Sequence, residues 1–377
     1  MIYVFNSAYA PKYQVNMLNT LCFPNGWTNE YRYTIGVNAP GQMQTQLKKY
    51  EGLGKAIVVY IDRYFEDGEG NKRYKYLPVR LGTYITSYRS VDRLIFKLQL
   101  GNFIFPENIE LFNENIVKEL SQYDMPKLVN SDPENTHDGQ YAIIADDIVS
   151  GIKHFSGDEA WGRCVDSIAE TSAFKHNDQR NFVFMRLELS KSTAKEDIIK
   201  PKISNNHWYS RKIENGDAYF LLSRACEYDL FATYKYPVQR KDKSKTALTK
   251  LSIDNHITSH SSEEIAIDVV ANTVKYKFSL KKDTIEIGGK IGFSTASLNE
   301  GIETKGPESG FQYRIKNSMS FWIQMLIAVI FFTGAGIFNG AYSTEKGFEF
   351  DMPTIIATVV QALAVLFMFY RTGKRIL

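Results

Sequence analysis

Two long uncharged segments near the end of the chain constrain its architecture more than any other feature of the sequence. The first runs from residue 319 to residue 338, and the second runs from residue 353 to residue 370. A helix needs about 20 apolar residues to cross the hydrocarbon core of a bilayer. Because the two segments follow each other across a short polar loop, we predict a transmembrane hairpin of two helices. A pair of buried core helices is the alternative interpretation.

Basic residues on the outer sides of this hairpin predict its orientation. Arg314 and Lys316 precede the first segment, and a basic tail, residues 371–377, follows the second, whereas the intervening loop holds one lysine and three acids. The positive-inside rule therefore places both outer flanks in the cytoplasm. The first residues of the chain lack the basic and apolar regions of a signal peptide. We therefore expect the N-terminal part and the C-terminus to be cytoplasmic.

A few residues within the two segments are candidates for helix packing or for a pore lining. A GxxxG motif allows helices to approach closely, and a glutamine side chain can form hydrogen bonds between helices or line a water-filled path. The candidates are Gln324, Gly336, Gly340 and Gln361. Two helices cannot enclose a pore, so conduction would require a homo-oligomer. The sequence does not determine the number of subunits, and we assume a tetramer.

The residues ahead of the hairpin predict a mainly β fold with a few helices. Short apolar or alternating runs, broken by turn residues, recur through most of this part of the chain. They indicate two small β units of barrel or sandwich type. The expected divisions are an N-terminal β-rich domain (1–128) with a helix at 107–122, a helical and linker segment (129–206), a second β domain (207–297) and a flexible tether (298–318).

Composition and motifs argue against several classes of function. Three cysteines in 377 residues are too few and too distant for a disulfide framework or a paired-cysteine metal site. The chain has no GxxxxGK[ST] loop, no HExxH motif and no GxSxG motif. We therefore predict a protein that is not an enzyme and that has no cofactor and no metal. An enzyme that uses acidic residues between Asp146 and Glu159 is an alternative, although helix capping also explains those residues.

Two places combine cations with aromatic side chains, and we predict that they bind a ligand. Cations attract phosphate groups and aromatic rings stack on bases, so either place suits an oligonucleotide or a nucleotide. The first place comprises Arg63, Arg73, Lys75 and Arg80, and the second comprises Tyr234, Tyr236, Arg240, Lys241, Lys243 and Lys245. Solvated charges beside core aromatics, or a solvated hairpin tip, are the structural alternatives. Residues 1–310 hold 39 basic and 39 acidic side chains, so any anion-binding surface there must be local.

The layout of the chain and its opening residues carry a resemblance to a known family. Residues 2–33 read IYVFNSAYAPKYQVNMLNTLCFPNGWTNEYRY, and a long cytoplasmic region precedes the C-terminal hairpin. Together they resemble the Hailong-type transmembrane effectors of bacterial anti-phage defence. The resemblance implies a location in the bacterial inner membrane and an oligomeric channel or membrane disruptor. It also implies control by a bound single-stranded DNA oligomer, and it transfers no functional residue.

The sequence therefore predicts a ligand-gated membrane effector of anti-phage defence. Binding of an oligonucleotide or nucleotide to the β domains would control pore opening or membrane disruption by an oligomer. Such control requires that the ligand bind one state of the oligomer more tightly than the other. The alternative is a membrane-tethered scaffold or receptor that binds a protein partner and forms no pore.

Overall fold

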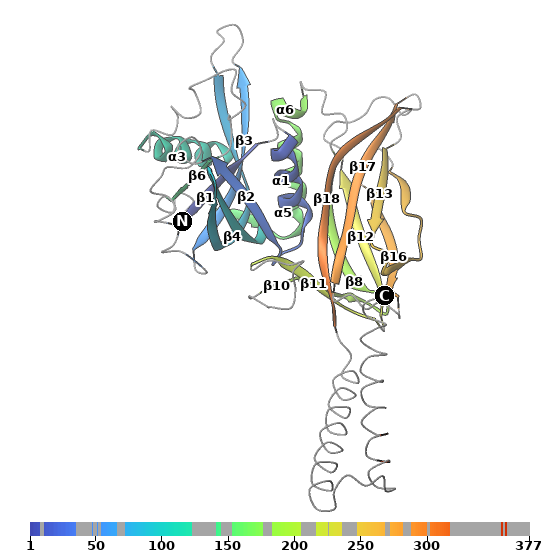
Figure 1. Ribbon diagram of the computed structural model, residues 1–377. Coiled ribbons are helices and arrows are strands. Elements are labelled where there is room, and N and C mark those ends of the chain that lie inside the picture. Colours follow the sequence, from blue (N-terminus) through green and yellow to red (C-terminus); the bar gives the residue numbers. More distant parts are fainter. Residues whose placement is uncertain are drawn as a thin grey trace, which may run out of the picture.

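The computed structural model describes about three fifths of the chain and shows a mainly β protein, as predicted. The described residues are 1–7, 11–34, 47, 51, 54–65, 72–122, 141–144, 153–175, 183–204, 216–224, 226–235, 247–267, 272–281, 288–299, 302–316, 356 and 359. They form three β-sheets and a few helices, which are arranged as an N-terminal unit and a second unit beside it (Figure 1).

The N-terminal unit is built on a mixed seven-stranded sheet with the order β2-β5-β4-β3-β1-β6, and β7 extends β5. Strand β1 runs parallel to β3, and the other pairs are antiparallel. The strands are β1 (Ile2–Asn6), β2 (Thr28–Thr34), β3 (Lys55–Phe65), β4 (Lys72–Ser90), β5 (Arg93–Pro106), β6 (Tyr141–Ile144) and β7 (His154–Ser156).

Both faces of this sheet are covered at its centre, and the sequence of β1 reflects that position. All five residues of β1, IYVFN, are buried, as expected for a central strand with apolar neighbours on both faces. On one face, Tyr3 and Phe5 pack with Phe112 and Ile116 of helix α3 (Ile109–Gln122). The helix predicted at 107–122 is therefore confirmed, and it protects that face from water.

The second unit consists of a six-stranded sheet and a five-stranded sheet. Their orders are β10-β11-β18-β17-β13-β15 and β14-β16-β12-β8-β9. The strands are β8 (Phe184–Lys191), β9 (Ala194–Ile198), β10 (Lys202–Ile203), β11 (Ala218–Ser223), β12 (Glu227–Lys235), β13 (Ala247–Ile253), β14 (Ile257–Ser259), β15 (Glu264–Ile267), β16 (Asn272–Leu280), β17 (Gly288–Asn299) and β18 (Ile302–Lys316).

The two sheets of the second unit share one hydrophobic core, as the layers of a sandwich do. Leu251 and Phe293 of the six-stranded sheet belong to the same buried cluster as Leu230 of the five-stranded sheet. A buried hydroxyl network also joins the layers. The Thr249 hydroxyl lies 2.7 Å from that of Tyr276 and is also hydrogen-bonded to that of Tyr234. This network satisfies hydroxyl groups that would be costly to bury alone.

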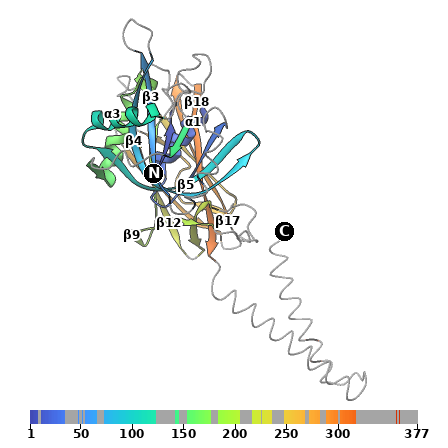
Figure 2. The same ribbon diagram turned by 90° about the vertical axis from the view of Figure 1, so that its left-hand side faces the viewer.

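Helices connect the two units through a continuous core. Helices α1 (Pro11–Cys22), α5 (Asp158–Ala169) and α6 (Ser172–Lys175) lie on the side of the N-terminal unit that faces the second unit. Figures 1 and 2 both show α1 beside β18, and the two elements are in contact. Helix α5 lies within the helical and linker segment predicted at 129–206. Helix α1 was not predicted, although Pro11 occupies a first-turn position that suits proline.

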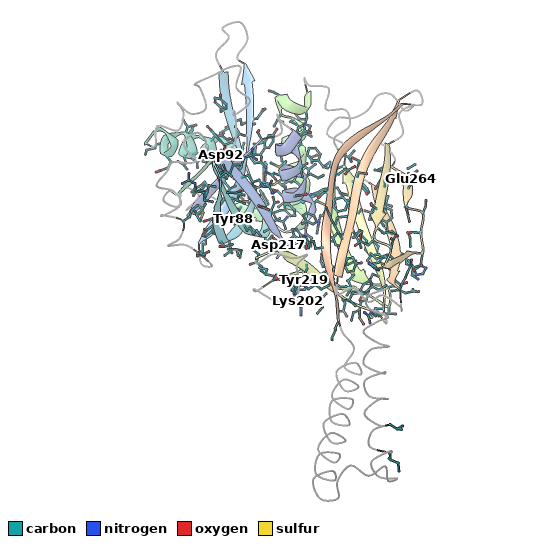
Figure 3. The ribbon with its side chains drawn as sticks, in the orientation of Figure 1. Tyr88, Asp92, Lys202, Asp217, Tyr219 and Glu264 are labelled. Carbon is teal, nitrogen blue, oxygen red and sulfur yellow. The ribbon has the colours of Figure 1, made fainter. Side chains whose placement is uncertain are left out.

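Aromatic rings and one buried ion pair strengthen this junction. The ring of Trp27 stacks on that of Phe23 with centroids 4.6 Å apart, and it lies 5.3 Å from the ring of Phe220 in β11. The ammonium group of Lys97, which is 3% exposed, lies 2.7 Å from a carboxylate oxygen of Asp217. Figure 3 shows Asp217 at the junction of the two units. The units therefore pack as one body.

The structure corrects the predicted tether and linker. Residues 302–316 form strand β18, which pairs antiparallel with β17 and parallel with β11. Phe311, Tyr313 and Ile315 are buried in the core, and their alternation is the period of a strand. The second β unit also begins earlier than residue 207, because β8, β9 and β10 belong to its sheets. Polar and glycine-containing residues before Phe311 had suggested a linker.

Among the described residues, no helix is long and apolar enough to cross a membrane. The two uncharged segments, 319–338 and 353–370, lie outside the described part of the chain, apart from Ile356 and Val359. Gln324, Gly336, Gly340 and Gln361 lie outside it as well.

Candidate ligand-binding pocket

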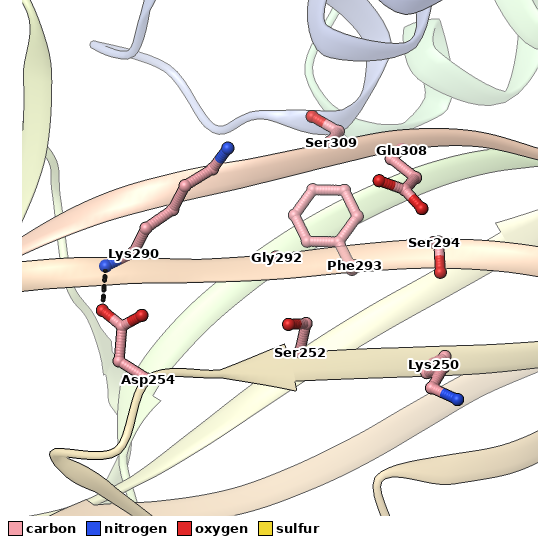
Figure 4. Close-up of a pocket in the computed structure, with 9 residues that line it drawn as sticks. All are labelled: Lys250, Ser252, Asp254, Lys290, Gly292, Phe293, Ser294, Glu308 and Ser309. Atoms are coloured by element: carbon pink, nitrogen blue, oxygen red, sulfur yellow. Dashed lines mark hydrogen bonds between the residues drawn. The ribbon is translucent and has the colours of Figure 1, made fainter.

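A pocket of about 610 Å³ lies on the six-stranded sheet of the second unit (Figure 4). Three neighbouring strands, β13, β17 and β18, contribute its walls. The lining residues are Lys250, Ser252, Asp254, Lys290, Gly292, Phe293, Ser294, Glu308 and Ser309. Their side chains are mostly short hydroxyls and charged groups, which suits a polar ligand.

Small residues aligned across the strands create the space for this pocket. Ser252 pairs with Gly292, and Gly292 pairs with Gly310, so three small residues lie side by side on one face of the sheet. A Cβ atom on Gly310 would lie 2.7 Å from the carbonyl oxygen of Ile291, so this position requires glycine. A Cβ atom on Gly292 would meet its nearest neighbour at 3.5 Å, an ordinary contact. A methyl group at Gly292 would therefore fit without displacing its neighbours.

Each end of the pocket presents a cation and a carboxylate. At one end Lys250 pairs with Ser294, which pairs with Glu308. The ammonium group of Lys250 also lies 2.6 Å from a carboxylate oxygen of Glu264. At the other end, the backbone N–H of Lys290 donates a hydrogen bond to Asp254 Oδ2 at 2.6 Å (Figure 4).

This arrangement is suited to a ligand that carries both negative charge and hydrogen-bond donors. The two ammonium groups can neutralise phosphate oxygens. The two carboxylates can accept hydrogen bonds from sugar hydroxyls or base amino groups. Because the cations lie at opposite ends of the pocket, a ligand with two separated anionic groups would fit better than a single small anion.

The strands that line the pocket contact the N-terminal unit through their opposite face. The ring of Phe293, which is 4% exposed, lies 6.1 Å from that of Phe23, just beyond the end of α1. The Ser309 hydroxyl donates a hydrogen bond to the side-chain oxygen of Asn19 in α1. Because Phe293 and Ser309 are adjacent in their strands to Gly292 and Gly310, their side chains lie on the opposite face of the sheet from the pocket and pack toward α1. A ligand that shifts β17 or β18 would therefore disturb the packing of α1 against the second unit.

The structure corrects the prediction that Arg80 binds a ligand. This side chain is fully buried, and its guanidinium group donates hydrogen bonds to three backbone carbonyl oxygens and one side-chain oxygen. The acceptors are Gly101 O at 2.7 Å, Thr20 O at 2.7 Å, Phe23 O at 2.6 Å and Asn25 Oδ1 at 2.9 Å. Arg80 thus satisfies carbonyl groups at and beyond the C-terminus of α1, which have no partner within the helix.

The guanidinium group of Arg80 remains charged at neutral pH. Burial lowers its pKa from 12.5 to about 9, still two units above pH 7. It also stacks on the ring of Phe103, with the guanidinium carbon 4.1 Å from the ring centroid. These contacts explain why a basic residue in an aromatic strand is part of the core here and not part of a surface.

The other members of the first predicted patch have different positions. Lys75 is exposed and lies opposite Asp62 in the pairing of β3 with β4. Arg63 and Arg73 lie in the same two strands, opposite Tyr74 and Tyr64 respectively, but their side chains are outside the described part of the structure. The structure describes two side chains of this patch, and of these Lys75 is at the surface and Arg80 is buried.

Of the second predicted patch, the structure describes one residue, Tyr234. Tyr234 is 1% exposed and forms part of the hydroxyl network with Thr249, so its prediction as a ligand-binding residue is corrected. Burial raises the pKa of Tyr234 well above its usual value, and the phenol stays protonated. The remaining members, Tyr236, Arg240, Lys241, Lys243 and Lys245, lie outside the described residues.

The cysteines and acidic residues of the described part show no arrangement typical of catalysis. Cys22, Cys164 and Cys226 are free. Burial raises the pKa values of the Cys22 and Cys164 thiols, and Cys164 Sγ lies 2.7 Å from the carbonyl oxygen of Ile104. Within the described ranges, no group of three histidine, cysteine or acidic side chains could hold a metal ion. Asp146 and Asp147 lie outside those ranges.

The sequence analysis missed Lys250, Lys290, Phe293 and Glu308 because they are far apart in the sequence. The only local signal was the run GGKIGFS at residues 288–294, which contains four small residues in a strand-like segment. Comparison with known proteins adds no assignment, since no protein family and no curated protein matches this chain.

Proposed function

We propose that this chain is a membrane-anchored effector of bacterial anti-phage defence, controlled by a nucleotide or oligonucleotide that binds in the pocket on β13, β17 and β18. The observation that supports this most strongly is the dual position of β18. Glu308 and Ser309 of this strand line the pocket, and the strand ends at Lys316. Only residues 317 and 318 separate its end from the uncharged segment at 319–338.

Strand β18 provides a direct mechanical connection between ligand and membrane. Seven residue steps separate Ser309 from Lys316, a span of about 23 Å at roughly 3.3 Å per residue. Hydrogen bonds to β17 along this length, and to β11 near its end, make the strand move as part of a sheet. A ligand that shifts β17 and β18 would therefore reorient the segment that follows.

The proposed output is a change in an oligomer of transmembrane hairpins at the bacterial inner membrane. Segments 319–338 and 353–370 form the hairpin of each subunit, and several hairpins, four in our working assembly, surround a pore or disrupt the bilayer. To shift the population ratio of the two states of the oligomer from 1:99 to 99:1, the ligand must bind the favoured state about 10⁴-fold more tightly than the other. Gln324 and Gln361 are the polar candidates for the pore lining or for hydrogen bonds between helices.

Ligand binding is tested with a fluorescently labelled single-stranded DNA oligomer and the purified full chain. The oligomer should bind, and Lys290→Ala should weaken binding about tenfold, because a charge-assisted hydrogen bond contributes about 1.5–3 kcal/mol. Lys75→Ala is the matched control, since Lys75 is exposed but distant in sequence and sheet from the pocket. A Lys290→Ala protein that binds as tightly as the wild type would contradict the assignment of the pocket.

The second sequence-based patch is tested in the same assay. Charge reversal of Arg240, Lys241, Lys243 and Lys245 should weaken binding if the segment contributes to the ligand site. Unchanged binding of every oligomer by that variant, together with weaker binding by Lys290→Ala, would restrict the site to the pocket.

Membrane activity is tested by replacing residues 319–370 with an unrelated membrane anchor. A voltage-sensitive dye should report depolarisation of bacteria that produce the natural chain, and none with the replaced tail, because the hairpin itself forms the pore. The alternative is a tethered scaffold that binds a protein partner. A replaced-tail protein that still protects bacteria from phage would favour that scaffold.

A further inference from the structure

One end of the second unit gathers the strand ends from both of its sheets. Strands β11 and β18 run parallel and end together, with Ser223 opposite Lys316. Strand β12 begins four residues after Ser223, and its first residue, Glu227, pairs with Ser279 near the end of β16. At the same end Tyr228 pairs with Lys191, the last residue of β8. Both sheets therefore present strand ends on one surface, at the lower end of the unit in Figure 1.

Hydrogen bonds hold the connections at this end together. The N–H of Ser223 donates to the Tyr228 hydroxyl at 2.5 Å, which joins the six-stranded sheet to the five-stranded sheet. The N–H of Lys281 donates to the carbonyl oxygen of His256 at 2.9 Å, and that of Ser192 donates to the carbonyl oxygen of Glu227 at 2.9 Å. These hydrogen bonds fix the described connections at this end relative to one another.

Positive charge predominates on this surface among the residues that the structure describes. We call it the basic end, defined by Lys191, Arg224, Lys281 and Lys316. Three of these side chains are exposed, and Arg224 is half-buried. Among the described residues, the carboxylates of Glu227, Asp229 and Asp254 lie nearby, and each has a partner. Asp229 is buried and accepts a hydrogen bond from the Ser192 hydroxyl at 2.6 Å. A further carboxylate, that of Asp197 in β9, is exposed. Glu227 lies 2.6 Å from the ammonium group of Lys277, and Asp254 accepts the backbone N–H of Lys290.

We infer that the basic end docks onto anionic phospholipid headgroups of the membrane into which the tail inserts. This inference rests on the proposed transmembrane hairpin, because that hairpin fixes where the membrane lies. Three residue steps from Lys316 reach residue 319, a distance of at most about 10 Å. This distance is comparable to the Debye length of about 8 Å at physiological salt, so charges at the end of β18 interact with the headgroups.

Lipid fits this surface better than a nucleic acid does. The cations stand at the ends of strands and in turns, and Lys191, Lys281 and Lys316 are spread over three strands from both sheets. A broad array of point charges suits a flat layer of separate headgroups, whereas single-strand recognition uses a groove with stacking aromatic rings. Docking would fix the height of the pocket above the membrane, so that movement of β18 acts on the hairpin.

The test uses the full chain in lipid nanodiscs of phosphatidylcholine alone or with 30% phosphatidylglycerol. Hydrogen–deuterium exchange is followed in peptides that cover the turns after Lys191 and around Arg224 and Lys281. Anionic lipid should slow exchange there about fivefold or more, since each cation near an anionic surface contributes about that factor in affinity. Adding 0.5 M salt should remove the difference, because it shortens the Debye length.

Two double charge-reversal variants test whether the lipid-dependent protection from exchange comes from the basic end. Lys191→Glu combined with Lys281→Glu should abolish the lipid-dependent protection. Lys55→Glu combined with Lys118→Glu is the matched control, because both of those lysines are exposed on the N-terminal unit and the change in net charge is the same. Lys316 and Lys290 are left unchanged, since the first flanks the predicted span and the second lines the pocket. Equal protection in the two double variants would overturn the inference.

Co-elution with nanodiscs in 0.5 M salt reports insertion separately. A chain that co-elutes but shows the same exchange in both lipids would contradict lipid docking by the basic end and would support insertion of the hairpin. A chain that associates only with phosphatidylglycerol discs, and only at low salt, would support the basic end and contradict the hairpin. A chain that associates with neither disc would contradict both proposals.

Discussion

Replacement of Arg80 by methionine tests whether this guanidinium group serves packing or ligand binding. Methionine has a similar length and keeps the contact with Phe103, but it cannot donate hydrogen bonds. The change leaves three backbone carbonyl oxygens without their donor, those of Thr20, Phe23 and Gly101, which lie 2.6–2.7 Å from the guanidinium nitrogens.

The expected loss of stability follows from those acceptors. A buried polar group that loses its partner costs about 1–3 kcal/mol, whereas removal of a buried charge returns part of its desolvation cost. Together, the cost of the three unsatisfied carbonyl groups and the partial return from the removed charge lower the free energy of unfolding by about 4 kcal/mol. With a urea dependence of about 3 kcal/mol per molar, the unfolding midpoint should fall by roughly 1.3 M.

Tryptophan fluorescence during urea unfolding of the full chain in detergent measures this shift. Trp161 Nε1 donates to the carbonyl oxygen of Leu21 at 3.2 Å, so it reports on the end of α1 that Arg80 holds. Arg89→Met is the matched control on the same strand, because Arg89 is exposed and donates a hydrogen bond to Val91 O at 3.0 Å on the surface. That control should change stability by less than about 0.5 kcal/mol. An Arg80→Met protein with a wild-type midpoint and weakened oligonucleotide binding would refute the packing role.

Further predictions concern alkaline stability, the pocket and the junction between the units. Burial raises the pKa of Tyr31 to about 12, against about 10 in an unfolded chain, so its stabilising contribution is complete below pH 10 and lost as the pH rises to 12. Urea unfolding at pH 9 and pH 12 should show that Tyr31→Phe loses up to about 2.7 kcal/mol less than the wild type over this interval, and an equal loss would contradict the argument. Gly310→Ala should destabilise the fold by about 1–3 kcal/mol, because its Cβ atom would press on backbone atoms. Gly292→Ala should keep the wild-type thermal midpoint, and an equal fall in both variants would show that the pocket face cannot accept any added methyl group. Trp27→Ala should cost about 3–5 kcal/mol in urea unfolding, since its ring packs against both units, and a loss below 1 kcal/mol would show that the aromatic junction contributes little.

Local patterns in the sequence were sufficient where a segment's neighbours along the chain decide its structure. The helix predicted at 107–122 corresponds to α3, and the helical segment predicted within 129–206 contains α5. Short alternating runs predicted a mainly β protein. Helix α1 carries a comparable signal in Met17, Leu18 and Leu21, all buried, but strands on both sides of it suggested an all-β region. The transmembrane hairpin stays a prediction from the sequence.

The remaining features depend on contacts between residues that are distant in the sequence. Strand β18 was mistaken for a tether because its first half is polar and contains glycine, although it pairs along most of its length with β17, the strand directly before it. Its last residues also pair with β11, about 90 positions earlier in the chain. Arg80 was mistaken for a surface cation because its acceptors lie in α1 and in the segment that follows α1.

The sequence by itself determined the class of fold, two of the helices and the uncharged segments of the tail, because each of these is a property of consecutive residues. Only the tertiary structure decided which cation is buried, where β18 pairs and where the pocket lies. Ser252, Gly292 and Gly310 become neighbours through the register of three strands. That register is set by long-range sheet pairing and core packing, which no local window of the sequence contains.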